Sequence, residues 1–150
     1  MRIVVKKAGK DYLKSAVKLE KFLIFPLVTS ATKKDLEPIF DNSLMWGVFD
    51  GDNLVGKVGY LKNEKDEYEV DGVVVHPDYR GKGLGKKLLS KAIKDLLKIH
   101  PKKIILYVHP QNSRAIVLYL KFGFIIQRWI SNKYGDGEPR LKMSLDLKKT

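Results

Sequence analysis

The stretch from residue 73 to residue 89 constrains the fold of this chain more than any other part of its sequence. Three consecutive valines predict a strand, and His76 and Pro77 end it. A basic turn with three glycines between residues 81 and 85 then opens a helix whose leucines recur at helical spacing. Glycines allow a ligand to approach the backbone closely, and the N–H groups of a helix start favour an anion. We therefore expect this strand–turn–helix unit to bind a phosphate group.

Two common phosphate-binding motifs do not fit this turn. A Walker P-loop has the pattern Gly-x4-Gly-Lys-Ser/Thr, and counting from Gly81 places Lys86 at the second glycine. A dinucleotide fingerprint has the pattern Gly-x-Gly-x-x-Gly, and Lys86 again stands in place of a glycine. The pattern that remains is Arg80-x-x-Gly83-x-Gly85.

Hydrophobic periodicity and turn residues predict the order β-α-α-β-β-β-α-β-α-β-β. We expect strands at residues 3–7, 44–49, 54–61, 68–75, 103–108, 124–130 and 141–147, and helices at residues 11–22, 32–40, 84–99 and 113–122. Asp11 is the expected cap of the first helix, and Phe25-Pro26 follow its end. Residues 68–108 form a strand–helix–strand crossover with two parallel strands, and ligands of such units bind beyond the strands' carboxyl ends.

Composition narrows the class of protein. The 150 residues fit a single domain, 1–150, and the absence of cysteine excludes disulfides and thiolate nucleophiles. The three histidines are widely spread, so we expect no metal site. No signal peptide or membrane span is visible, and we expect a soluble, cytoplasmic protein. The net charge of +12 fits a polyanionic cofactor, a nucleic acid or a lysine-rich proteome alike.

The pattern that remains after these exclusions resembles the acetyl-CoA loop of the GNAT acetyltransferase superfamily. A second pattern at the expected distance is similar to the family's Asn…Ala…Tyr…Gly-Phe signature: Asn112-x-x-Ala115-x-x-x-Tyr119-x-Lys121-x-Gly123-Phe124. The resemblance covers the chain from about Leu44 to the C-terminus. It implies an α/β (mixed α+β) fold with a central, mostly antiparallel sheet of about seven strands, four helices and a β-α-β cofactor unit.

The same resemblance implies roles for individual residues. The turn would bind the pyrophosphate of acetyl-CoA, the strand at residues 73–75 would pair with the pantetheine arm, and Asn112 would hold the arm from the other side. The implied cofactor residues are Val73, Val74, Val75, Arg80, Gly81, Lys82, Gly83, Leu84, Gly85, Lys86, Asn112 and Tyr119. Tyr119 would also protonate the departing CoA thiolate. Without cysteine, direct attack of an amine on the thioester is the economical mechanism, with the N–H near Val75 polarising the carbonyl.

Three residues are candidates for the general base, and the sequence does not choose among them. Relatives often carry glutamate or histidine five residues before the asparagine, where this chain has Tyr107. An unperturbed tyrosine has a pKa of about 10 and is a poor base. Glu69 and Asp71 occupy alternate strand positions that share a face with the cofactor strand, and either can act through a water molecule.

The acceptor also stays open. Glu20-x4-Phe25-Pro26 and the segment 132–138 resemble features of ribosomal-protein-type N-alpha-acetyltransferases, which implies substrate contacts from Phe25 and Tyr134. Lys133, Pro139-Arg140 and Tyr107 depart from that pattern. We therefore expect acetyl-CoA and an amine acceptor as partners: a peptide N-terminus or a small amine or polyamine with equal weight, and a lysine side chain after them.

A second class of function remains as the alternative. The basic surface also fits a catalytically idle module that senses acetyl-CoA or binds nucleic acid. The only aromatic and basic stretch that could support RNA binding is residues 124–129, and its spacing favours packing in a core and a hairpin. We expect a monomer or homodimer with neither a membrane nor a nucleic-acid partner.

Overall fold

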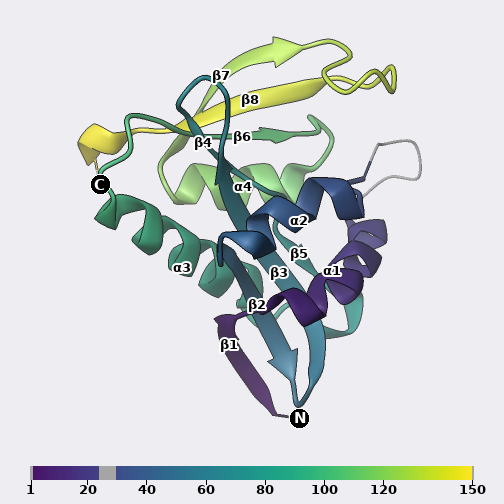
Figure 1. The fold of residues 1–150 in the computed structure, drawn as a ribbon. Helices are drawn as coiled ribbons and strands as arrows, with labels where there is room; N and C mark the ends of the chain where they lie inside the picture. Colours follow the sequence, from purple (N-terminus) through teal and green to yellow (C-terminus); the bar gives the residue numbers. More distant parts are fainter. Residues whose placement is uncertain (1, 24–29, 150) are drawn as a thin grey trace.

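The computed structural model describes residues 2–23 and 30–149, and its central element is one mixed sheet (Figure 1). The sheet order is β1-β2-β3-β4-β6-β8-β7, and β5 pairs with β3 beside this path. The strands are β1 (Ile3–Lys7), β2 (Met45–Asp50), β3 (Asn53–Lys62), β4 (Tyr68–Val70), β5 (Val74–Val75), β6 (Ile104–Val108), β7 (Phe124–Ile130) and β8 (Arg140–Leu145). All pairings are antiparallel except β4 with β6.

Helices cover both faces of this sheet (Figure 1). The α-helices are α1 (Leu13–Leu19), α2 (Lys33–Asp41), α3 (Leu84–Lys98) and α4 (Ser113–Lys121), and short 3-10 turns are η1 (Lys10–Tyr12), η2 (Glu20–Phe22), η3 (Pro77–Tyr79) and η4 (Leu147–Lys149). Val48 and Val58 pack in the cluster that contains α3, whereas Phe49 packs with α1 and α2. Successive side chains of a strand point to opposite faces, so β2 separates two apolar layers. The expected fold class is confirmed.

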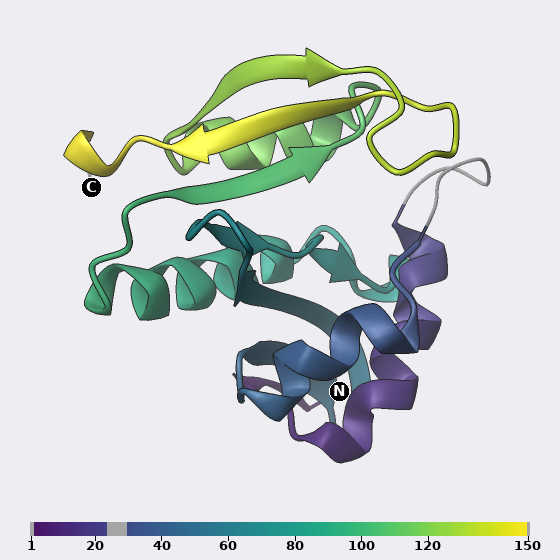
Figure 2. The same cartoon turned by 45° about the horizontal axis from the view of Figure 1, so that its top comes forward.

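The predicted strand at residues 68–75 is wrong as a single element, because it splits into β4 and β5. Val70 pairs with Tyr60, but Val75 pairs with Gly56, so the register against β3 shifts by one residue between the two strands. One extra residue in a strand is a β-bulge, which bends the strand and increases its twist. β4 also pairs in parallel with β6, which confirms the expected crossover, whereas β5 pairs with β3 alone (Figure 2).

The N-terminal helix also differs from the prediction. Asp11 lies inside η1 and caps nothing; α1 begins at Leu13 without a side-chain cap. In contrast, the predicted start of α2 is confirmed, because Thr32 and Asp35 form a reciprocal capping box. The predicted break at Phe25-Pro26 lies outside the described residues. Within residues 2–23 and 30–149, the structure has no helix long and apolar enough to cross a membrane.

Candidate active site

The turn before α3 leaves its backbone open to a ligand. Gly81 and Gly83 have φ angles of +79° and +72°, which L side chains rarely adopt, and a Cβ built on either would meet nothing within 4 Å. α3 begins at Leu84, and the N–H groups of a first helical turn have no partner inside the helix. That first turn contains no acidic residue. Its electrostatics therefore favour an anion, as the sequence predicts.

The strand β5 presents one free backbone edge next to this turn. The His76 N–H donates to Val55 O at 2.8 Å, and neighbouring residues of an antiparallel ladder alternate in direction. Val75 therefore directs its N–H away from β3, toward the side on which β5 has no strand partner among the described residues. An extended ligand can pair with such an edge.

Arg80 links the turn to the end of η2. Its Nε donates to Val75 O at 3.0 Å, and its Nη2 donates to Phe22 O at 2.9 Å. The sequence analysis placed Arg80 among the cofactor residues only, and it could not show this second contact. The guanidinium thus joins the turn to the segment that enters the neighbouring cavity.

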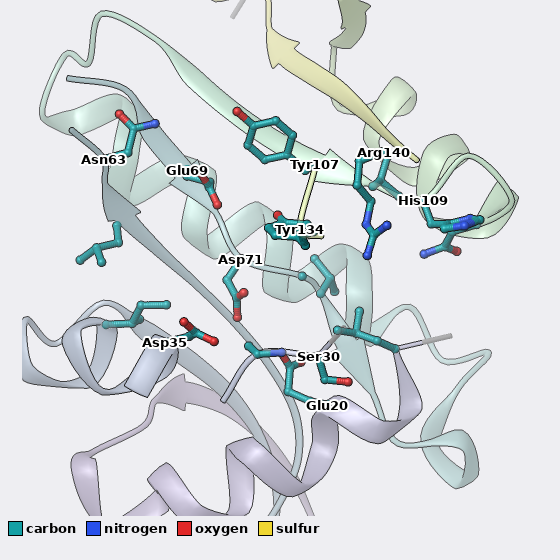
Figure 3. Close-up of a pocket in the computed structure, with 18 of the residues that line it drawn as sticks. Glu20, Ser30, Asp35, Asn63, Glu69, Asp71, Tyr107, His109, Tyr134 and Arg140 are labelled. Carbon is teal, nitrogen blue, oxygen red and sulfur yellow. The ribbon is translucent and has the colours of Figure 1, made fainter. Parts of the chain in front are cut away.

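A cavity of about 390 Å³ opens beside β4 and the C-terminal end of β6 (Figure 3). It collects most of the side chains that the sequence singled out for catalysis and acceptor binding: Glu69, Asp71, Tyr107, Asn112, Tyr119 and Tyr134. Val73 also lines it, whereas the glycine turn lies outside this lining. Phe25 lies outside the described residues. Segments far apart in the chain thus meet around one space.

Tyr119 is a buried residue of the cavity lining. The residue is 4% exposed, and burial raises the pKa of its hydroxyl to about 12. A hydrogen bond from the backbone of Val73 has the opposite, smaller effect on this pKa. The hydroxyl is therefore protonated at neutral pH and can give a proton. Asn112 caps α4 with its side-chain oxygen, which accepts from Ala115 N at 3.2 Å, so its NH2 group is the part that can contact a ligand.

A buried lysine holds two carboxylates on one side of the cavity. Lys57 is 0% exposed, and its Nζ lies 2.6 Å from Asp71 Oδ2 and 3.1 Å from Glu20 Oε2. Burial disfavours the charged form of Lys57, but Asp71 and Glu20 outweigh it and keep the pKa of the ammonium above its usual value. Burial raises the pKa of Glu20, opposed by Lys57. Asp71 is thus held next to β5 as one member of a charged trio.

Glu69 and Tyr107 have environments different from that of Asp71. No described cation forms an ion pair with Glu69, and burial raises the pKa of its carboxyl, with opposition from Lys133. The pKa of Tyr107 is also raised, first by burial and then by Glu69. A higher pKa makes a carboxylate a better base near neutral pH, but it makes a tyrosine a poorer one, since the hydroxyl stays protonated. The three base candidates are thus unequal.

The loop at residues 131–139 forms the outer side of the cavity around Tyr134. Its ring lies 6.5 Å from that of Tyr107, and Lys133 Nζ and Arg140 Cζ lie 5.3 Å and 5.0 Å from its centre. His109 ties this loop to β6, because its Nε2 lies 3.0 Å from Glu138 Oε1. His109 Nδ1 accepts from Gln111 N, so the Nε2 carries the proton and donates it to Glu138.

Sequence reasoning missed two parts of this site. Lys57 was assigned only to a strand, although a lysine between apolar residues of a central strand signals either a solvent face or a buried ion pair. His109 was assigned to a loop, and no local pattern connects it to Glu138. Among the described residues, no group of three or more His, Cys, Asp or Glu side chains is arranged to hold a metal ion.

The comparisons with known proteins agree on one family. The family model described as acetyltransferase (GNAT) family matches residues 17–124. The mycothiol acetyltransferase of Corynebacterium efficiens is 34% identical over 79 residues, which are 53% of this chain and 27% of that protein. The probable spermine N(1)-acetyltransferase of Bacillus subtilis subsp. natto is 37% identical over 84 residues, which are 53% of this chain and 49% of that protein. The matches span about a third of the length of the mycothiol acetyltransferases.

Solved structures share the fold over nearly the whole chain. A chain of the NatC complex bound to Gag peptide and CoA has a TM-score of 0.82 and 22% identity, and the match covers 98% of this chain and 99% of that one. The ribosomal-protein-S18-alanine N-acetyltransferase from Escherichia coli has a TM-score of 0.78 and 24% identity, with 95% and 92% covered. At these identities the two structures establish a common fold, and they confirm the resemblance that the sequence predicts.

Proposed function

The chain belongs to the acetyltransferase (GNAT) family, and from this premise we propose that it is an acetyl-CoA-dependent N-acetyltransferase. The observation that carries the proposal is the position of buried Tyr119, which lines the cavity and is hydrogen-bonded to the backbone of Val73, the residue before β5. That arrangement joins a proton donor, an extended binding edge and an open glycine turn. An idle binding module needs the last two and has no use for the first.

The glycine turn and β5 are the proposed donor site. The open backbone at Gly81 and Gly83 gives room for a pyrophosphate, and the start of α3 adds favourable electrostatics. On the outer edge of β5, Val75 O already accepts from Arg80 Nε, so the Val75 N–H is the group proposed to face the thioester end of the pantetheine arm. One of the structures with the same fold was solved with CoA. Acetyl-CoA is the proposed co-substrate, and it brings the activated acetyl group.

The proposed reaction is direct transfer within a ternary complex. Glu69 takes a proton from the acceptor ammonium through a water molecule, and the neutral amine attacks the thioester carbonyl. A C–N bond forms and the C–S bond breaks, while the Val75 N–H stabilises the oxyanion and the nitrogen loses its second proton to solvent. Tyr119 gives its proton to the departing thiolate and regains one from solvent. Glu69 is preferred over Asp71 because Asp71 forms an ion pair with Lys57 at 2.6 Å, and over Tyr107 because the hydroxyl of Tyr107 stays protonated.

The proposed acceptor is a primary amine, either a peptide N-terminus or a small amine. The loop around Tyr134 and the fold shared with peptide-bound NatC support a peptide. The sequence similarity to a spermine acetyltransferase supports a small amine. Both acceptors use the same donor site and the same proton transfers.

An assay of thiol release tests this proposal. The protein, acetyl-CoA and a panel of N-terminal peptides, polyamines, aminoglycosides and lysine peptides are mixed, and the products are checked by mass spectrometry for one added acetyl group. Acetyl-CoA alone is expected to raise the Tm by ligand linkage. A Tm shift without transfer to any amine would indicate an idle acetyl-CoA-binding module, and a shift with oligonucleotides but not acetyl-CoA would indicate a nucleic-acid binder.

A further inference from the structure

The charge of the cavity is opposite to that of the chain. The net charge of the protein is +12, yet four carboxylates line the cavity, from Glu20, Asp35, Glu69 and Asp71 (Figure 3). The carboxylates come from three separate parts of the chain: η2, α2, and β4 with the residue after it. The protein as a whole is therefore basic, whereas this cavity is acidic. We ask which ligand such a cavity would favour.

The positive groups nearby do not balance these carboxylates. Lys57 is shared between Glu20 and Asp71, which leaves that trio with one negative charge. Of the three basic side chains in the lining, Lys62 is paired with Asp66 at 2.6 Å, Arg140 with Asp136 at 3.0 Å and His109 with Glu138 at 3.0 Å. Residues 24–29 carry no charged side chain.

Asp35 and Glu69 have no cationic partner within residues 2–23 and 30–149. Asp35 Oδ2 accepts from the Thr32 N–H at 2.8 Å and from the Thr32 hydroxyl at 2.9 Å, and both donors are neutral. Glu69 is in no ion pair among the described residues, and the nearby Lys133 lies over the rings of Tyr107 and Tyr134. The described cavity therefore keeps an excess of negative charge.

Glu20 adds a buried carboxylate to the acidic side of the cavity. Glu20 is 2% exposed and lines the cavity, and its Oε1 accepts from Ala31 N at 3.1 Å. Its Oε2 is fully buried and makes no hydrogen bond in the described structure, although Lys57 Nζ is 3.1 Å away. Lys57 is thus the counter-ion of this oxygen, and Glu20 acts on the cavity through its charge.

We infer that the acceptor is an aliphatic diamine or polyamine, whose second ammonium group is held by the acidic side of the cavity. This inference rests on the proposed function. One nitrogen is deprotonated and acetylated, while another stays charged beside the carboxylates. Glu69 and Asp71 are two residues apart along an extended segment, about 6.6 Å, which is comparable to the separation of nitrogens across a three- or four-carbon spacer. A peptide N-terminus brings a single ammonium and leaves the remaining carboxylates unbalanced.

A matched pair of acceptors tests the inference directly. 1,4-Diaminobutane and butylamine differ by one ammonium group and have the same carbon chain. Loss of one charged hydrogen-bonding group is expected to lower kcat/KM about tenfold or more, mainly through KM, and added salt should narrow the difference. Equal kcat/KM values for the two amines would overturn the inference, as would a higher kcat/KM for a peptide without charged side chains than for the diamine. Either result would leave the acetyltransferase proposal standing.

A pair of variants on α2 tests whether the preference for the diamine depends on the carboxylates of the cavity. Asp35→Asn removes a charge and keeps an oxygen that can accept from Thr32, so the capping of α2 is retained. Its KM for the diamine should rise about two- to fivefold, with no change for butylamine. Asp41→Asn makes the same change at the other end of α2, outside the cavity lining, and should leave both KM values unchanged. An equal rise in both variants would indicate a general effect of net charge and contradict the inference.

The two proposals fail in different ways. If no amine is acetylated although acetyl-CoA raises the Tm, the proposed enzyme activity fails, and the acceptor inference fails with it. If amines are acetylated but the second ammonium brings no advantage, only the acceptor inference fails. The Tm shift with acetyl-CoA is measured for every variant, so a folding defect is recognised before rates are compared.

Discussion

The proposed donor side and the proposed acceptor side of this molecule differ in the groups that they use. The donor side consists of the turn before α3 and the edge of β5, and it acts through backbone groups. Its features are the positive φ angles of Gly81 and Gly83, the free N–H groups at the start of α3 and the outward N–H of Val75. All of them come from one contiguous stretch of sequence.

The acceptor side acts through side chains that the fold brings together. Glu20 comes from η2, Lys57 from β3, Tyr107 from β6 and Tyr134 from a loop near the C-terminus. Any of these side chains can change without altering the path of the backbone. The donor site can therefore stay constant while the acceptor site varies, and the relatives indeed carry different names, mycothiol acetyltransferase and spermine N(1)-acetyltransferase.

The largest expected effect is on the donor side, for Gly83→Val. A β-branched side chain at φ +72° strains the backbone, by about 1–3 kcal/mol, and fills the space that a pyrophosphate would use. The variant should lose the entire rise in Tm that acetyl-CoA causes. Gly51→Val is the matched control, because Gly51 has a φ of +60° and equally open surroundings in the β2–β3 turn. An intact acetyl-CoA shift in the Gly83 variant would remove the turn from the donor site.

Tyr119→Phe is expected to have the next largest effect and to separate chemistry from binding. Loss of a general acid lowers kcat by about 10²-fold or more, while the acetyl-CoA shift in Tm should remain, since the ring still fills its buried site. Tyr60→Phe provides the comparison: Tyr60 is also buried, its pKa is also raised to about 12, and it contacts Asp95 outside the cavity. A Tyr119 variant with the rate of the Tyr60 variant would exclude the proposed acid.

Glu69→Gln should change the pH dependence more than the binding. Burial raises the pKa of Glu69 above 4.5, and Asp71 and Glu67 add to the increase, whereas Lys133 and Lys142 oppose it. The carboxylate must be unprotonated to act as a base, so kcat/KM rises with pH through this raised pKa and falls as the pH drops below it. In the glutamine variant, kcat/KM should no longer rise with pH in this range, and it should be about tenfold lower near pH 7. An unchanged pH dependence would assign the base to another group.

The same contrast explains which parts of the structure the sequence predicts. The β4–α3–β6 crossover and the start of α2 at Thr32 follow from local patterns, and the structure confirms both. The break between β4 and β5 is not local, because β4 must pair with both β3 and β6 while β5 pairs with β3 alone. The valines of this segment favour a strand in either arrangement.

The acceptor side shows more clearly what cannot be predicted from the sequence. Glu69, Asp71 and Tyr107 could be named as base candidates from the sequence, but their different environments depend on distant residues. The sequence contains Lys57 without indicating that its side chain is buried between Glu20 and Asp71. Electrostatic environment is a property of the folded assembly, so spacing alone cannot rank such candidates.

The smallest effect concerns Arg80, whose side chain joins the two sides. Its Nε and Nη2 donate to two different carbonyl groups, Val75 O on β5 and Phe22 O at the end of η2. Arg80→Lys keeps the charge, but a single ammonium cannot reproduce the spread of a guanidinium. Because η2 also carries Glu20, we expect KM for the acceptor to rise about two- to fivefold, with the acetyl-CoA shift in Tm nearly unchanged. Arg128→Lys makes the same change on β7, outside the cavity lining, and should alter neither quantity. A reduced acetyl-CoA shift with an unchanged acceptor KM would instead assign Arg80 to the donor side alone.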